Sequence, residues 1–150
     1  MGKKNVLDNV VIQSVENYTA AGTSAITSDE VDTANCESVT FLVKFGAIAS
    51  GAVTSVKVQQ FPTTGGSGAA DLEGSGVTVL DTDDNKVVAI EIVKPRERYL
   101  YCYVSRATQN STVEWIVAIK NFVRKSPTGD GDSIVAAGKN VLVSPAEGTA

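Results

Sequence analysis

The most informative run of this sequence reads Arg98-Tyr-Leu-Tyr-Cys-Tyr-Val-Ser-Arg106 and continues, after a polar turn at 107–112, as Val113-Glu-Trp-Ile-Val-Ala-Ile-Lys-Asn-Phe122. Both parts show the period-two pattern that is typical of half-buried strands. We expect them to pair as the central hairpin of an antiparallel β-sandwich. The second part contains the only tryptophan, Trp115, in an apolar row that we expect to face the core.

The first of these strands has two chemically different faces. Its odd positions carry three of the four tyrosines, namely Tyr99, Tyr101 and Tyr103, and its even positions are apolar. The tyrosine face has two interpretations: a platform that binds a sugar or a partner, or packing beneath a loop or a neighbouring subunit. Packing is the commoner outcome for such a row.

Other segments repeat the strand pattern. Ser38–Phe45 alternates with Val39, Phe41, Val43 and Phe45 inward, and Leu42 is the exception to the alternation. Val53–Phe61 and Lys86–Lys94 are also extended, and helix is disfavoured where β-branched and glycine residues dominate. The expected fold class is therefore all-β, a single antiparallel β-sandwich.

The termini fall outside this pattern. We expect residues 1–16 to be an N-terminal arm or an edge strand, residues 17–126 to be the β-sandwich domain, and residues 127–150 to be a C-terminal arm. The apolar residues of these ends are candidates for partner binding: Val10, Ile12, Val141, Leu142 and Val143. The tail has a second possible fate, an additional edge strand on its own sandwich, and the sequence leaves both open.

Composition limits the classes of function. The 150 residues carry 17 acidic and 13 scattered basic side chains, which argues against nucleic acid as a partner. No apolar run is long enough for a signal peptide or a membrane span, so we expect no membrane partner and no export by the general secretory pathway. Cys36 and Cys102 fit buried thiols better than a disulfide.

Catalytic and metal-binding signals are weak. The chain has no histidine, which excludes histidine-based catalysis and most zinc sites. Asp81, Asp83 and Asn85 imitate the start of a calcium loop, but Lys86 stands where glycine is needed, so a hairpin turn is expected. The glycines of 63–70 lack a phosphate-binding pattern. We expect no catalytic, cofactor or metal residues, and not an enzyme.

A longer pattern resembles a known family. Residues 29–46 read Asp-Glu-Val-Asp-Thr-Ala-Asn-Cys-Glu-Ser-Val-Thr-Phe-Leu-Val-Lys-Phe-Gly, which resembles small virion structural proteins of tailed bacteriophages. The similarity continues in pieces to Pro127, through an extended segment, a Gly- and Asp-rich loop, Arg98-Tyr-Leu100 and an apolar strand. It departs at Phe61-Pro-Thr-Thr-Gly-Gly66, where the family often has Asp-Asp-Gly.

The resemblance implies a jelly-roll-like sandwich with extended terminal arms that decorates or cements a phage capsid. Its implied partner is the major capsid protein, bound across subunit seams on the virion surface, and its implied oligomer is a homotrimer whose arms clasp capsid subunits. A neck, tail or head-fibre component is the alternative within the same virion. A carbohydrate-binding module that uses the tyrosine face or the glycine-rich loop is the alternative from another class.

Overall fold

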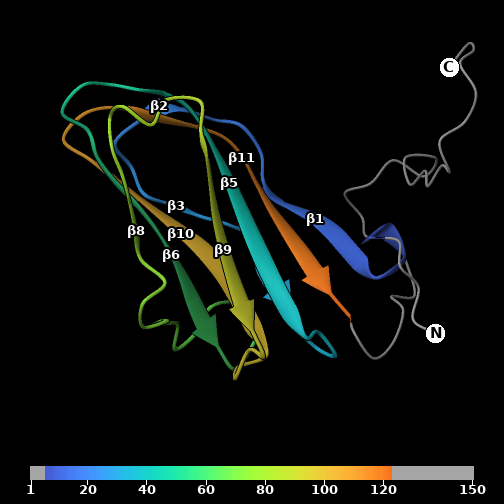
Figure 1. The fold of residues 1–150 in the computed structure, drawn as a ribbon. Coiled ribbons are helices and arrows are strands. Elements are labelled where there is room, and N and C mark those ends of the chain that lie inside the picture. The colour runs from blue at the N-terminus through green and yellow to red at the C-terminus, as the bar shows by residue number, and fades with distance from the viewer. Residues whose placement is uncertain (1–5, 123–150) are drawn as a thin grey trace, which may run out of the picture.

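A computed structural model describes residues 6–122 as an antiparallel β-sandwich of two layers (Figure 1). The elements in chain order are the short 3-10 helix η1 (Val6–Asp8) and the strands β1 (Val10–Glu16), β2 (Thr19–Gly22), β3 (Ile26–Thr27), β4 (Val31–Asp32), β5 (Ser38–Ile48), β6 (Val53–Phe61), β7 (Ala70–Asp71), β8 (Val77–Val79), β9 (Val87–Val93), β10 (Tyr99–Ala107) and β11 (Ser111–Asn121). The expected all-β sandwich class is confirmed.

The strands form two sheets. Sheet A has the order β1-β11-β5-β9, with β2 also paired to β11. Sheet B has the order β3-β10-β6-β7, with β4 also paired to β10 and β8 to β6. The chain passes from one sheet to the other between β2 and β3, between β4 and β5, between β5 and β6, between β8 and β9, and at each later connection. From β9 onward, consecutive strands therefore lie in opposite sheets.

The core is built from the inward positions of both sheets. In β5 these positions are fully buried, as the alternation predicts: Val39, Phe41, Val43 and Phe45. Sheet B supplies a matching set: Val56, Val58, Leu100, Cys102 and Val104, each 0% exposed. Each buried aliphatic or aromatic side chain contributes roughly 1.5–3 kcal/mol by leaving water. This double layer of apolar side chains holds the sandwich together without a disulfide, because Cys36 and Cys102 are free thiols.

The predicted hairpin between β10 and β11 is wrong. β10 pairs along its whole length with β6, from Tyr99↔Phe61 to Ala107↔Val53, and β11 pairs with β5 and β1. The connecting residues instead form an arch, in which Thr108 has a φ of 68° and Gln109 N–H donates to the Ala107 carbonyl at 2.8 Å. Two adjacent strands that each have an apolar face can bury those faces by stacking across the core as well as by pairing edge to edge. Alternation cannot tell these arrangements apart.

The prediction that Trp115 lies in the core is also wrong. Val113 pairs with Phe45 but Trp115 pairs with Lys44, so β11 has one residue more than β5 at this point. This β-bulge reverses the alternation, because side chains switch faces when one residue is inserted. Beyond it, Ile116 and Ala118 face the core at 0% exposure, and Trp115 lies half-buried on the outer face.

Of the two possibilities for the N-terminal segment, the structure has the edge strand. β1 pairs antiparallel with β11, from Val10↔Asn121 to Ser14↔Val117, and Val15 is 1% exposed in the core. Residues 10–16 are therefore part of the sandwich. The tail residues Val141, Leu142 and Val143 lie outside the described residues.

Candidate partner-binding surface

The three tyrosines of β10 lie half-buried on the outer face of sheet B. Beside them, on β6, Phe61 is only 1% exposed although it also points away from the core. Its ring centroid lies 5.7 Å from that of Tyr99 and 5.0 Å from that of Tyr101. These rings form a small apolar cluster that is separate from the main core.

The glycine-rich loop after β6 lies against this cluster. Glu30 anchors the loop by accepting hydrogen bonds from the Thr64 hydroxyl and from the Gly65 N–H, the latter at 2.8 Å. These bonds, that of Thr64 first, lower the pKa of the Glu30 carboxyl. Gly66 has a φ of 73°, and a Cβ there would lie 3.3 Å from the Tyr101 ring. Glycine thus permits both the left-handed turn and the close approach to the ring.

The charged groups of this face are satisfied within the chain. Lys57 Nζ donates to Asp71 at 2.8 Å and lies 5.1 Å from the Tyr103 ring centroid. Gln59 donates to the same carboxylate at 2.6 Å, and the bond from Lys57, followed by that from Gln59, lowers the pKa of Asp71. The charged groups Lys57 and Asp71 on the outer face of sheet B therefore already bond within the chain and are less available to a sugar or a protein. The geometry matches packing beneath a loop.

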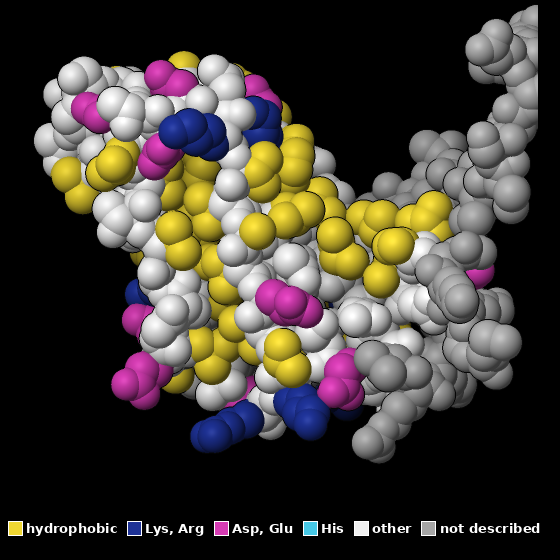
Figure 2. All heavy atoms as spheres, viewed as in Figure 1, with side chains coloured by type: hydrophobic (Ala, Val, Ile, Leu, Met, Phe, Trp, Pro, Cys, Tyr) yellow, Lys and Arg dark blue, Asp and Glu magenta, His cyan; other side chains and the backbone are white. Residues whose placement is uncertain are grey.

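The outer face of sheet A has a different character. By strand register, apolar side chains occupy this face on every long strand: Val10 and Ile12 on β1, Trp115, Val117 and Ile119 on β11, Leu42 on β5, and Val87, Ala89 and Val93 on β9. Figure 2 shows a run of hydrophobic side chains extending across these strands. We call this set of nine residues the apolar face.

The apolar face is continuous across the sheet. Ile12 pairs with Ile119, Val117 pairs with Leu42, and Leu42 pairs on its other side with Ala89. Val87 and Val93 are 48% and 60% exposed. The charged side chains among these positions are Lys44 and Glu91, and Glu91 accepts a hydrogen bond from the Ser38 hydroxyl at 2.7 Å. Of the predicted partner-binding residues within 6–122, Val10 and Ile12 belong to this surface, and the tyrosines lie on the opposite sheet.

Sequence reasoning missed most of the apolar face. Leu42 could have indicated an apolar outer face, because it is an apolar residue at an outward position of an otherwise regular strand. Val117 and Ile119 were assigned to the core with Trp115, because the bulge that turns them outward leaves no recognisable pattern.

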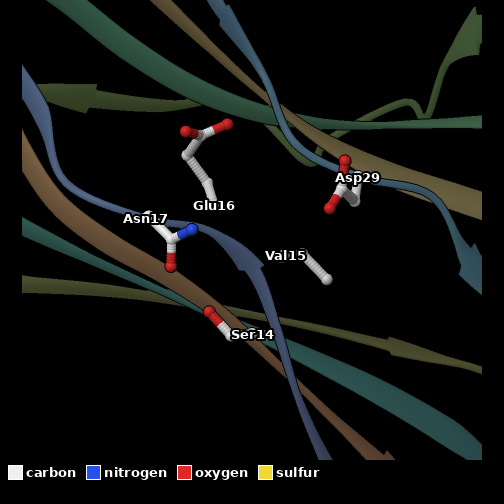
Figure 3. A pocket seen from close by; sticks show the side chains of 5 residues that line it. All are labelled: Ser14, Val15, Glu16, Asn17 and Asp29. Carbon is white, nitrogen blue, oxygen red and sulfur yellow. The ribbon is translucent and has the colours of Figure 1, made fainter. Parts of the chain in front are cut away.

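A polar hollow of about 620 Å³ lies where β1 ends (Figure 3). Its lining contains two carboxylates, Glu16 and Asp29, which do not point toward each other. Glu16 accepts a hydrogen bond from the Thr19 hydroxyl at 3.3 Å, and the Asp29 N–H donates to the Val15 carbonyl at 2.7 Å. The lining has no lysine, arginine or cysteine.

The remaining reactive groups serve the fold. Burial raises the pKa of the Cys102 thiol to about 12, which keeps it protonated at neutral pH. Arg106 is 7% exposed and donates to the carbonyls of Ser24, Ala20 and Ser111, and burial lowers the pKa of its guanidinium.

The acidic turn after β8 also has a structural role. Asp81 accepts from the Gly51 N–H at 2.9 Å, and Asp84 accepts from the Ile48 N–H at 2.6 Å. These bonds tie the turn to the β5–β6 connection. In the part of the chain that the structure describes, no group of three or more acidic or cysteine side chains is placed to hold a metal ion. Within residues 6–122, no helix is long and apolar enough to cross a membrane.

No protein-family model matches this sequence, and no curated protein matches it. Among solved structures, the fold is similar to that of a chain described by the words "Bacillus endospore appendages form a novel family of disulfide-linked pili". The two chains are 14% identical with a TM-score of 0.45, over 76% of this chain and 88% of that one. A likeness at this level carries no argument for function.

Proposed function

We propose that this protein is a structural component of a tailed-phage virion, which decorates or cements the capsid by binding the major capsid protein across subunit seams. It is made in the host cytoplasm and acts on the virion surface, without catalysis and without binding nucleic acid or membrane. The observation that carries the proposal is the apolar face of sheet A. The resemblance of residues 29–127 to small virion proteins supplies the identity of the partner.

The size of the apolar face suits a contact surface. Four strands spaced at about 4.8 Å, each with about seven residues at about 3.3 Å, give roughly 400 Å² for the whole outer face of sheet A, including its polar positions. Patches of roughly 300–600 Å² are the largest on ordinary monomers and are often functional. An isolated contact of this size is weak, since stable interfaces bury about 800 Å² on each partner.

Assembly on a shell compensates for a weak single contact. A homotrimer presents three apolar faces at once, and linked binding sites gain avidity without any new contact. We therefore include the homotrimer in the proposal. Light scattering of the purified protein measures the oligomer directly, and a strict monomer at all concentrations contradicts this part of the proposal.

The two alternative functions differ from the proposed one in the position on the particle or in the surface that they would use. A neck, tail or head-fibre component would use the same apolar face on a different part of the particle, and labelling of intact particles by electron microscopy distinguishes these positions.

A carbohydrate-binding module would need the tyrosine cluster of sheet B, which lies beneath the loop that Glu30 anchors. Binding on a glycan array that is lost in Tyr101→Ala would favour it.

The test compares one variant on each outer face. Leu42→Asp places a charge in the middle of the apolar face, and Thr78→Asp places the same charge at an exposed position of sheet B. Each purified protein is added to phage particles that lack it, and bound copies are counted by quantitative mass spectrometry. We expect wild type and Thr78→Asp to bind alike and Leu42→Asp to lose at least about tenfold in occupancy, which corresponds to about 1.4 kcal/mol.

Two results overturn the proposal. The first is the absence of the wild-type protein from the particles. The second is equal occupancy of Leu42→Asp and wild type, provided that circular dichroism shows the variant to be folded.

A further inference from the structure

β9 forms an open edge of sheet A. It pairs with β5 on one side, from Val87↔Lys44 to Val93↔Ser38, and no strand within residues 6–122 pairs with its other side. Along that side runs a groove of about 340 Å³ between β9 and residues 72–75, which connect β7 to β8. Its apolar lining includes Leu72, Ile90 and Ile92, which also pack against the core. An extended segment placed in this groove would meet both unpaired backbone groups and apolar side chains.

The opposite edge of sheet A is engaged near the C-terminal end of β1. The Val15 carbonyl of β1 accepts the Asp29 N–H at 2.7 Å, and the Gln13 amide donates to the Glu30 carbonyl at 3.5 Å. These bonds close the sandwich beside β1. The β9 side is therefore the more available edge for an additional strand.

β11 and β9 end at the same end of sheet A, where Phe122 N–H donates to the Asn9 carbonyl beside β1. β11 ends at Asn121, which lies in the same cross-strand row as Ser38 of β5 and Val93, the last residue of β9. A position beyond β9 is three strand spacings from β11, or about 14 Å. A chain that crosses this distance and turns back runs antiparallel to β9, which requires no change in the pattern of the sheet.

The tail sequence contains a segment whose composition suits an added strand. Asn140-Val-Leu-Val143 is followed by Pro145, which limits a strand at that end, and its two valines have high β-propensity. Lys139 precedes it, and both charged residues of the groove lining, Glu73 and Glu91, are acidic. The second apolar run of the tail, residues 134–137, contains two alanines and suits a strand less well.

We propose that Asn140–Val143 binds the open edge of β9 in the same molecule, as an antiparallel strand that fills the groove beside Leu72, Ile90 and Ile92. For a random coil with the number of residues in 123–139, the expected root-mean-square end-to-end distance is about 23 Å, which is longer than the ~14 Å span. Such a linker gives an effective concentration in the millimolar range. The strand from the same molecule therefore outcompetes one from a neighbour at ordinary protein concentrations.

Hydrogen exchange on the full chain tests this proposal. In the wild type, the β9 amides that do not donate to β5 are expected to be protected. Leu142→Asp is expected to speed their exchange at least about tenfold, since an opening that becomes 1.4 kcal/mol easier has that effect. Val135→Asp, in the other apolar run, is the matched control and leaves them unchanged. The amides of β5 and β11 report global unfolding and stay protected in all three proteins.

Each alternative outcome contradicts a definite part of the proposal. Unprotected β9 amides in the wild type show that no strand is added, and equal effects of the two variants show that Asn140–Val143 is not the segment. Protection that disappears on hundredfold dilution shows that the strand comes from a second molecule. None of these results depends on capsid binding, so this proposal and the proposed function can fail separately.

Discussion

Replacing Phe61 by alanine tests whether the loop over sheet B forms a second apolar cluster. In a simple sandwich, an outward-facing phenylalanine on β6 would be half-exposed and its loss would cost little. Here the side chain is 1% exposed and lies between Tyr99 and Tyr101. The structure therefore predicts a cost typical of a core residue.

The magnitude follows from two contributions. Burying a phenylalanine side chain contributes about 1.5–3 kcal/mol. Each of its two aromatic pairs, with Tyr99 and Tyr101, adds about 0.5–1.5 kcal/mol beyond the buried area. The loop that covers the ring can collapse into part of the space, so we expect Phe61→Ala to lower the free energy of unfolding by about 3 kcal/mol. In a 150-residue protein this corresponds to a fall in Tm of about 6–12 °C.

Urea unfolding followed by the fluorescence of Trp115 measures this change, because Trp115 is the only tryptophan and lies on the other sheet. Leu80→Ala is the control, since Leu80 is 58% exposed and its loss is expected to stay within about 0.5 kcal/mol. A cost below about 1 kcal/mol for Phe61→Ala would refute the covered cluster. It would restore the tyrosine face as an accessible platform.

Three further results are expected. Trp115→Ala is expected to cost about 1–2 kcal/mol in thermal unfolding, less than the 3–5 kcal/mol of a fully buried tryptophan, because Trp115 is half-buried; a larger loss would place it in the core. The pKa of the Glu30 carboxyl is lowered in the folded state by its hydrogen bonds to Thr64 and Gly65. These bonds therefore stabilise the loop fully above the ordinary pKa of 4.5, and the stabilisation is lost as the pH falls through the lower pKa of the folded state. Protection of the Gly65 amide from exchange, corrected for the intrinsic rate, should fall over that range, and Glu30→Ala should remove the pH dependence. Reductant is expected to leave Tm unchanged because Cys36 and Cys102 are free thiols, and a drop of several degrees would reveal a disulfide.

The burial of individual strands could be predicted well from the sequence. β5 places Val39, Phe41, Val43 and Phe45 inward as expected, because a buried face imposes a strict period of two. The same period of two correctly distinguished the buried face of β10 from its half-buried tyrosine face. Local alternation determines which side chains of a strand are buried whenever the strand is regular.

The pairing of strands could not be predicted in the same way. β10 and β11 are adjacent in sequence and both amphipathic, yet they lie in opposite sheets. Their partners, β6 and β5, are distant in the sequence, and no local feature identifies them. The covered position of Phe61 was missed for a similar reason, since it depends on a loop that Glu30 anchors from another part of the chain.

One inserted residue explains both the misplaced tryptophan and the missed apolar face. The bulge between Val113 and Trp115 places Glu114 as the extra residue of β11 opposite β5. Without it, strict alternation would direct Trp115, Val117 and Ile119 inward and expose Ile116 and Ala118, as the sequence suggested. With it, the smaller pair fills the core and the larger residues join Leu42 and Ile12 outside. A strand with apolar residues on both faces costs solubility in a free protein, and that cost is removed when the outer face is covered by a partner. The bulge thus places these apolar side chains on the outer face of sheet A, and it is the reason why the proposed interface is on sheet A rather than on the tyrosine face.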